Sequence, residues 1–269
     1  MPPSLINLLR NLVPSRSNGI STGPSGSGQQ RRNGLYVEFI GPPGVGKSTI
    51  YNELTGAAGD LMKLSVLKRE LNLPPQRLGN EHDELYGTLA GQMLHAIAMK
   101  DYAPMDKMRV LGYFHRVIED DKLAVLHNPG RIVVSDEGLF HNFRSSIEHE
   151  MSKGPMSRDF CSMRAIVSIR SHPRTIAERI LKRRLETGDM LPQHKGKDLD
   201  RLAMDQEEVC GQYMRFRDTL EQAGIPVLDI DGSADLRENV NAIRGFITSI
   251  TTSKQDQAGP SFPPPRKRP

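Results

Sequence analysis

Residues 41–49 read Gly-Pro-Pro-Gly-Val-Gly-Lys-Ser-Thr, a spacing of residue types suited to holding an anion. Glycines adopt backbone angles that other residues avoid, so the main chain can wrap around an anionic group. Successive backbone N–H groups and the N-terminus of a following helix can then point at a phosphate. The pattern Gly-x4-Gly-Lys-Ser/Thr is that of a phosphate-binding loop, in which the lysine serves the β- and γ-phosphates and the serine serves Mg²⁺.

The context of this motif is the one that a phosphate-binding loop requires. A short apolar strand, Leu35–Ile40, ends at the first glycine, and a helix is predicted from Lys47 to about Thr55. We therefore expect a site for a nucleotide and Mg²⁺. An Asn-Lys-x-Asp element of the kind that selects guanine is missing from the sequence, so ATP is the favoured nucleotide. The candidate binding residues are Gly41, Pro42, Pro43, Gly44, Val45, Gly46, Lys47, Ser48 and Thr49.

Two acidic residues, Asp136 and Glu137, follow a second apolar segment, Arg131–Ser135. Its Ile-Val-Val core is typical of a buried parallel strand, and the carboxyl edge of such a sheet is where ligands bind. Asp136 is thus a candidate magnesium ligand together with Ser48. Glu137 can orient a nucleophile or accept its proton. The sequence leaves open which of the two acids acts as the base.

A basic helix segment supplies two more candidates. Arg179 and Arg183 are four residues apart, so they share one face of a helix that is predicted to begin at Pro173. A polar segment from Thr187 to Lys197 follows and can form a lid whose arginines stabilise a transferring phosphoryl group. The alternative is a solvated basic face that is paired with nearby glutamates.

The rest of the chain alternates between strand and helix patterns. Such alternation predicts an α/β fold, a doubly wound parallel sheet of four or five strands with helices on both faces. Residues 61–128 are expected to be mostly helical, with no convincing strand between 56 and 130. Further strands are predicted at Ala165–Ile169 and Pro226–Ile230, and further helices at 173–185, about 199–223 and about 234–249.

Composition divides the chain into three parts. Residues 1–34 carry four arginines and no acidic residue, residues 35–250 form the predicted domain, and residues 251–269 are rich in proline. The two tails are predicted to be disordered, with a protein contact as one role for them. The net charge of +4 arises in the tails, since the segment between them has more acidic than basic residues. This distribution argues against a nucleic-acid-binding domain.

The sequence also bounds the class of protein. It has two cysteines, Cys161 and Cys210, too few for a disulfide scaffold. Its apolar runs fall short of the roughly 20 residues that a transmembrane helix needs. We expect a cytoplasmic protein, with a mitochondrial one as the alternative because residues 1–37 are rich in Arg and Ser. For residues 1–13, a frayed terminus and a weak membrane-surface or partner contact also stay open.

Between residues 35 and 250 the sequence resembles the P-loop nucleotide kinases, including thymidylate-kinase-like and deoxynucleoside-kinase-like proteins. The resemblance rests on residues 41–49, the strand ending at Asp136, the Pro173 helix with its two arginines, and residues 227–233. It implies the P-loop NTPase fold. It also implies that residues 231–233 lie against the adenine.

The sequence departs from these kinases on the acceptor side. Where they place an arginine after the acid of the third strand, this chain has Glu137 and Gly138. The region 61–130 shows no acceptor pattern. Candidate acceptor contacts follow from position only and are Arg109, Tyr113, Arg116, His141 and Arg144, whereas His115 and His172 are interpreted as structural.

Two functions follow from these motifs. The first is a kinase that transfers the γ-phosphoryl group of Mg-ATP to an unidentified small acceptor, a nucleoside, nucleotide or sugar-like molecule. In it Lys47, Asp136, Glu137, Arg179 and Arg183 carry the chemistry. The second is an ATPase or nucleotide-dependent switch that acts on a protein partner, because an acid directly after Asp136 is what water-activating ATPases use.

Overall fold

The structure is a computed structural model that describes residues 34–56, 61–71, 82–126, 130–188 and 194–257. Residues 1–33 and 258–269 of the predicted tails lie outside these residues, as does the central part, 189–193, of the predicted lid. Among the described residues, none of the helices is long and apolar enough to cross a membrane.

Five parallel strands form one sheet in the order β2-β3-β1-β4-β5. The central strand β1 (Leu35–Ile40) is buried along its whole length because it has a neighbour on each side and helices on each face. The chain crosses to one side of β1 for β2 and β3 and to the other side for β4 and β5. The strands around β1 are β2 (Leu61–Lys63), β3 (Ile132–Ser135), β4 (Arg164–Arg170) and β5 (Val227–Asp231).

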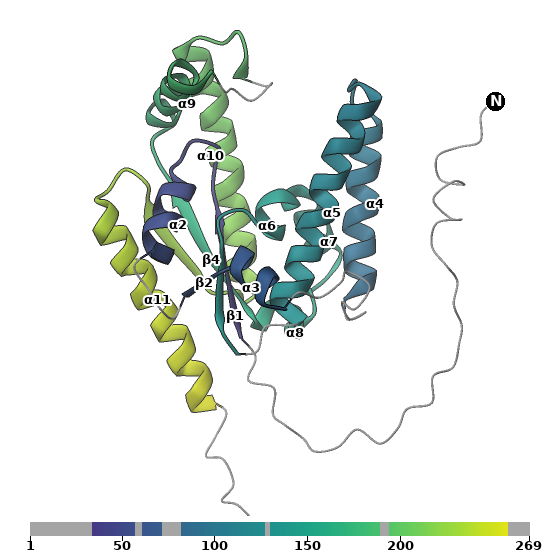
Figure 1. Cartoon of the computed structure of the whole chain (residues 1–269), viewed down its shortest axis with the longest axis vertical. Helices are drawn as coiled ribbons and strands as arrows, with labels where there is room; N and C mark the ends of the chain where they lie inside the picture. The colour runs from purple at the N-terminus through teal and green to yellow at the C-terminus, as the bar shows by residue number, and fades with distance from the viewer. Residues whose placement is uncertain (1–33, 57–60, 72–81, 127–129, 189–193, 258–269) are drawn as a thin grey trace, which may run out of the picture. The chain divides into compact units, whose positions relative to one another are not determined.

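Helices cover both faces of this sheet (Figure 1), so the predicted α/β fold is confirmed. Helices α2 and α11 pack against each other on one face, while α5 and α6 contact β1 from the other. The described helices are α2 (Lys47–Gly56), α3 (Leu64–Leu71), α4 (Asp83–Ala98), α5 (Pro104–Leu126), α6 (Leu139–Asn142), α7 (Arg144–Lys153), α8 (Arg158–Ser162), α9 (Pro173–Thr187), α10 (Leu199–Gln222) and α11 (Leu236–Gln257).

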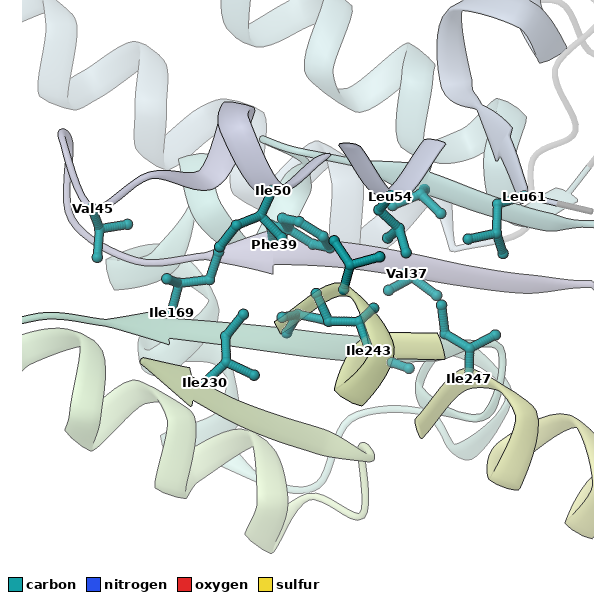
Figure 2. Packing of buried hydrophobic residues seen from close by; sticks show 14 of the residues in the cluster. Val37, Phe39, Val45, Ile50, Leu54, Leu61, Ile169, Ile230, Ile243 and Ile247 are labelled. Atoms are coloured by element: carbon teal, nitrogen blue, oxygen red, sulfur yellow. The ribbon is translucent and has the colours of Figure 1, made fainter. Parts of the chain in front are cut away.

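Alternate side chains of β1 enter two different cores. Val37 and Phe39 pack with Leu54 of α2 and Ile243 of α11 in one apolar cluster (Figure 2). Ile40 belongs to a second cluster, which side chains of α4 to α8 and α10 complete on the opposite face. Both faces of β1 are therefore fixed, and the loop that follows Ile40 leaves the sheet at a defined place.

Two helices begin where their first residues satisfy the free backbone N–H groups. Helix α9 has Pro173 in its first turn, and the ring nitrogen Nδ1 of His172 accepts the N–H of Arg174 at 3.3 Å. Helix α10 is capped by Asp198, whose carboxylate accepts the N–H of Arg201 at 2.8 Å. His172 thus has the structural role that the sequence indicated.

Two predictions need correction. The expectation of no strand between 56 and 130 is wrong, because Leu61–Lys63 pairs in parallel with β3. This edge strand has only three residues and passes directly into α3, so it is too short to show a periodicity. The last helix continues to Gln257, which makes the first seven residues of the predicted tail 251–269 helical.

A buried ion pair fastens α5 to the sheet. Arg164 of β4 donates from both terminal nitrogens to the carboxylate of Asp121, at 2.6 Å each, and both residues are at most 1% exposed. The hydroxyl of Tyr86 in α4 donates to the same carboxylate at 2.7 Å. The guanidinium also lies 3.9 Å from the ring centroid of Phe160. These contacts set the position of α4 and α5 beside the sheet.

Removing one partner of this pair is expected to be costly, since the other charge stays buried without compensation. Asp121→Ala should lower the free energy of unfolding by about 3–5 kcal/mol, measured by urea denaturation. The matched control is Asp106→Ala on the same helix, where an exposed carboxylate pairs with Arg109 at 3.3 Å, and it should change stability by less than about 0.5 kcal/mol. Equal costs for the two variants would contradict this account of the pair.

Candidate active site

The loop after β1 has the backbone conformation that its glycines allow. Gly41, Gly44 and Gly46 have φ angles of 147°, 87° and 111°, which side chains disfavour. A Cβ atom on Gly41 would lie 2.5 Å from the carbonyl oxygen of Ile169, at the end of β4. The loop therefore packs backbone against backbone on the neighbouring strand and leads into the first turn of α2 at Lys47.

Lys47 is 5% exposed and curls back over the loop. Its Nζ donates to the carbonyl oxygens of Gly41 at 3.0 Å and Pro42 at 3.3 Å, and lies 3.7 Å from Oε1 of Glu137. Burial lowers the pKa of the Lys47 ammonium, and the charges of Glu137 and Asp136 oppose that shift. The ammonium group thus stands between the loop and the acidic pair.

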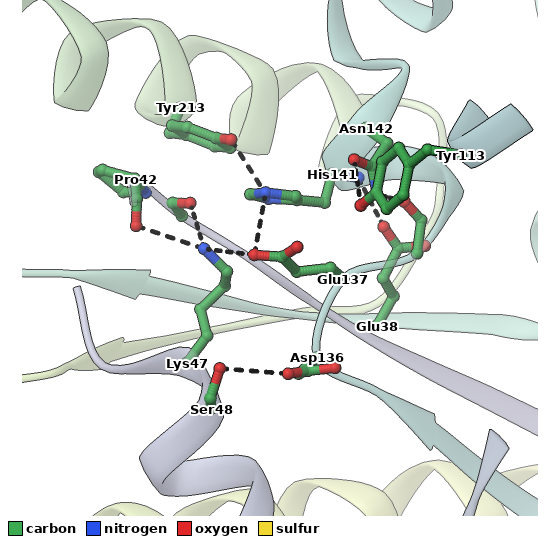
Figure 3. Close-up of polar contacts among 12 residues, drawn as sticks. Glu38, Pro42, Lys47, Ser48, Tyr113, Asp136, Glu137, His141, Asn142 and Tyr213 are labelled. Atoms are coloured by element: carbon green, nitrogen blue, oxygen red, sulfur yellow. Dashed lines mark hydrogen bonds and ion pairs between the residues drawn. The ribbon is translucent and has the colours of Figure 1, made fainter. Parts of the chain in front are cut away.

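Ser48 and Asp136 meet across the edge of the sheet. The hydroxyl of Ser48 donates to Oδ2 of Asp136 at 3.2 Å (Figure 3). The contact arises because β1 and β3 are adjacent parallel strands, so the loops at their carboxyl ends lie side by side. The pairing of these two residues is the one expected from sequence.

Glu137 and Asp136 have different surroundings although they are consecutive. The carboxylate of Glu137 is 45% exposed and points between Lys47 and His141, with Oε1 at 3.7 Å from Nζ of the first and from Nε2 of the second (Figure 3). Nδ1 of His141 in turn lies 3.2 Å from the hydroxyl of Tyr213 on α10. Asp136 is directed toward Ser48 instead.

His141 is a neutral imidazole at physiological pH. Burial, and after it the positive charges of Lys47 and Arg144, together lower its pKa to about 3. The ring therefore offers one N–H donor and one lone pair and carries no charge. It is stacked on the ring of Tyr213, with 5.8 Å between centroids.

The two predicted lid arginines have different positions. The guanidinium of Arg179 donates to the carbonyl oxygens of Val45 at 2.9 Å and Gly232 at 3.1 Å, so it joins the loop at 41–49 to the loop after β5. Arg183 is exposed, and its positive charge lowers the pKa of Lys47. Of the two, only Arg183 lines the cavity described next.

A cavity of about 320 Å³ opens at this edge of the sheet. It brings together residues from the loop, the acidic turn, α9 and the segment before α10. Its polar lining includes Lys47, Ser48, Thr49, Glu137, Arg183 and His194. Six of the nine predicted phosphate-loop residues, Pro43, Gly44, Gly46, Lys47, Ser48 and Thr49, thus line one cavity with Glu137.

Of the five acceptor contacts expected from position, only His141 lines this cavity. Tyr113 and Arg144 have partners outside its lining. The hydroxyl of Tyr113 donates to Oδ1 of Asn142 at 3.0 Å, and the charges of Glu137 and Asp136 add to the rise in its pKa that burial causes. Arg144 donates to Gln212 at 2.6 Å, and its guanidinium lies 4.8 Å from the ring centroid of Tyr213.

The other two predicted acceptor contacts and His115 are turned toward local partners on α5. Arg109 is 80% exposed beside Asp106, and Arg116 donates to the carbonyl oxygen of Gly112 one turn earlier. His115 is 71% exposed and lies 3.6 Å from Glu119.

Four residues in or next to the site were missed from sequence: Asn142, His194 and Tyr213, and Glu38 behind the acidic turn. Glu38 had a visible signal, because a charged residue interrupts an apolar strand three positions before Gly41. Tyr213 stands at an apolar position in the spacing of its helix, yet its hydroxyl contacts His141. Asn142 and His194 have no local pattern, because Tyr113, which contacts Asn142, and the phosphate loop, which shares the cavity with His194, lie in distant segments.

The sequence matches no protein-family model and no curated protein. Among solved structures, a shikimate kinase from Bacteroides thetaiotaomicron has a TM-score of 0.41 at 12% identity, over 80% of this chain and 98% of that one. A gluconokinase from Sinorhizobium meliloti 1021 has a TM-score of 0.36 at 17% identity, over 86% of this chain and 100% of that one. Neither is a thymidylate or deoxynucleoside kinase. Likenesses this weak say nothing about activity, so the functional argument rests on the site.

The acidic turn depends on a close approach at Gly138. A Cβ atom there would lie 2.6 Å from the carboxyl group of Glu38 and 2.6 Å from the hydroxyl of Tyr36. Gly138→Ala should therefore displace the turn and lower the free energy of unfolding by about 1–3 kcal/mol, measured by chemical denaturation.

The matched control is Gly245→Ala in α11, where nothing lies within 4 Å of an added Cβ. In a helix this change is neutral or stabilises by up to about 1 kcal/mol. If Gly138→Ala were as stable as this control, the turn would not be packed as described.

Proposed function

We propose that the protein is an ATP-dependent phosphotransferase that moves the γ-phosphoryl group of Mg-ATP to a hydroxyl group of a small acceptor. The observation that carries this proposal is the meeting of Lys47, the Ser48–Asp136 pair and Glu137 at one edge of the sheet, beside a cavity. Each of these groups matches one requirement of phosphoryl transfer.

The loop at 41–49 is suited to the phosphates of the nucleotide. Its glycines have no side chains, so an anion can approach the main chain closely. The free N–H groups in the first turn of α2 are suited to the same anion. Lys47 lies close enough to exchange the carbonyl oxygens of Gly41 and Pro42 for phosphate oxygens. The loop at 231–233 is the proposed neighbour of the base, and its Gly232 carbonyl is tied to the phosphate loop through Arg179.

The donor set at Ser48 and Asp136 fits Mg²⁺. A hydroxyl and a carboxylate oxygen 3.2 Å apart are oxygen ligands of the kind this ion prefers, and Mg²⁺ usually keeps several waters beside them. A bound Mg²⁺ would neutralise charge on the β- and γ-phosphate oxygens. The protein supplies the position of these two oxygens through adjacent strands.

The surroundings of the two acids assign them different roles. Asp136 faces Ser48, which makes it the proposed magnesium-side acid. Glu137 faces the cavity beside neutral His141, which makes it the proposed base. A general base has to be within reach of the proton that it takes, and only Glu137 of the two lines the cavity.

The transfer follows from these positions. The acceptor oxygen forms a bond to the γ-phosphorus while the bond from that phosphorus to the β–γ bridging oxygen breaks, and ADP leaves. The acceptor proton passes to the carboxylate of Glu137. Lys47 and Arg183 place positive charge beside the transferring group, so catalysis is mainly positioning and electrostatics.

A second candidate function has one observation in its favour. The half-exposed carboxylate of Glu137 can orient a water molecule as well as an acceptor hydroxyl. The protein would then be an ATPase or a nucleotide-dependent switch whose partner is another protein. The two functions differ in whether ADP release needs a small acceptor.

The test is ADP release from Mg-ATP, with and without pools of nucleosides, nucleoside monophosphates and sugars. We expect one pool to stimulate release. Glu137→Gln should lower the stimulated rate by about 10²- to 10⁴-fold while leaving ATP affinity within about threefold, because a base acts in the transition state.

The matched control is Glu178→Gln, an exposed carboxylate on α9 that pairs with Arg174 at 3.8 Å, and its rate should equal that of the wild type. A rate that no pool changes, but that Glu137→Gln abolishes, would favour the ATPase switch over the kinase. A stimulated rate that survives in Glu137→Gln would contradict the role of Glu137.

A further inference from the structure

Glu38 is a buried acid in the middle of the central strand. Its neighbours Val37 and Phe39 face the core formed with α2 and α11, so Glu38 faces the opposite side, toward α5 and α6. The residue is 1% exposed. A carboxyl group at such a place costs free energy unless it has hydrogen-bond partners, and an ionised one costs far more.

The two oxygens of Glu38 have unequal partners. Oε1 accepts the backbone N–H of His141 at 2.6 Å (Figure 3). Oε2 is buried, and it has no hydrogen-bond partner among the residues that the structure describes. One accepting oxygen and one without a donor is a poor environment for a carboxylate, which needs donors at both oxygens.

The same carboxyl group defines the path of the acidic turn. A Cβ atom on Gly138 would come 2.6 Å from Cδ and from Oε2 of Glu38. The turn therefore lies directly on this carboxyl group, with Glu137 immediately before the contact and His141 held by a hydrogen bond after it. Glu38 touches neither the cavity nor the phosphate loop through any of these contacts.

Charged and titratable groups face Glu38 from several elements. They are Tyr36 on the same strand, Asp121 of α5, Arg164 of β4, Tyr213 of α10 and the backbone N–H groups of α6. The pKa of Glu38 is raised to about 8, with burial as the largest cause. Asp121 adds to the rise, while Arg164 and the N–H groups of His141 and Phe140 oppose it.

We propose that Glu38 is a positioning residue that acts as a neutral carboxylic acid and holds the turn carrying Glu137 and His141. This role belongs to the same site, and the activity measurements that test it rest on the proposed function. The neutral acid accepts the N–H of His141 without placing a negative charge beneath Glu137. Ionisation of Glu38 would place its negative charge on one side of the turn and that of Glu137 on the other, and the turn would become less stable.

Glu38→Gln is the decisive variant because it keeps the accepting oxygen and cannot ionise. Near neutral pH it should turn over like the wild type. As pH rises through about 8 the wild type should lose turnover relative to the variant, and the backbone amide signal of His141 should titrate with the same midpoint in the wild type only. Identical pH profiles, or an amide signal that behaves alike in both proteins, would overturn the proposal.

Stability gives an independent readout with a defined sign. The pKa of Glu38 is raised from 4.5 to about 8, so its contribution is complete below pH 4.5 and is lost as the pH rises toward 8. The urea midpoint of the wild type should therefore fall relative to that of Glu38→Gln between pH 4.5 and about 8. Above pH 8 the difference between the two midpoints should stay constant. Parallel midpoints from pH 4.5 to 8 would contradict a neutral Glu38.

Removing the hydrogen bond separates positioning from packing. Glu38→Leu should lower kcat by about 10- to 100-fold with the KM for ATP unchanged, because the turn shifts and the phosphate loop does not. The matched control Val133→Ala, a fully buried residue of β3, should lose stability without this loss of kcat. An unchanged kcat in Glu38→Leu would overturn the proposal. If the wild type shows no turnover with any acceptor, the proposed function fails, and the His141 amide and the midpoint shift still decide the role of Glu38.

Discussion

The phosphate loop packs so closely against neighbouring backbone that there is no room for side chains at Gly41 and Gly232. A side chain on Gly41 would strike the carbonyl oxygen of Ile169, and one on Gly232 would come 2.5 Å from the carbonyl oxygen of Val45. Arg179 closes the arrangement with two hydrogen bonds to backbone oxygens. Because strands β1, β4 and β5 are neighbours in the sheet, these loops meet at one edge, and every other feature of the site is placed relative to them.

Chemical roles in the site follow the order of the strands. Strand β1 delivers the loop with Lys47 and Ser48, and its neighbour β3 delivers Asp136 and Glu137 a few ångströms away. One acid faces the loop and the other faces the cavity, although they are consecutive in sequence. We attribute the difference to the turn that follows them. Glu38 accepts a hydrogen bond from the N–H of His141 in this turn, and Gly138 packs against the Glu38 carboxyl group. Glu38, a buried acid in β1, thus contributes to the different orientations of Asp136 and Glu137 after β3.

Sequence reasoning succeeded where the signal is local. The glycine spacing of the phosphate loop and the apolar run before it lie within fifteen residues, and the strand, loop and helix were predicted with their bounds nearly right. It failed for β2, whose three residues owe their strand conformation to pairing with β3. The tie made by Arg179 spans 134 residues to Val45, and the bond from Glu38 to His141 spans 103. Contacts at such separations leave no spacing pattern in the sequence. An unusual residue such as Glu38 can be identified from sequence, but its contact partner cannot.

The proposed function requires that the loop at 41–49 bind the phosphates of ATP through its backbone and Lys47. The most direct test is calorimetric titration of the full chain with Mg-ATP, comparing the wild type with Lys47→Ala. We expect measurable binding by the wild type that is lost in the variant, with the two proteins unfolding at similar urea concentrations. Normal ATP binding by Lys47→Ala would contradict both the kinase and the ATPase account, because each places the same ammonium group on the β- and γ-phosphates.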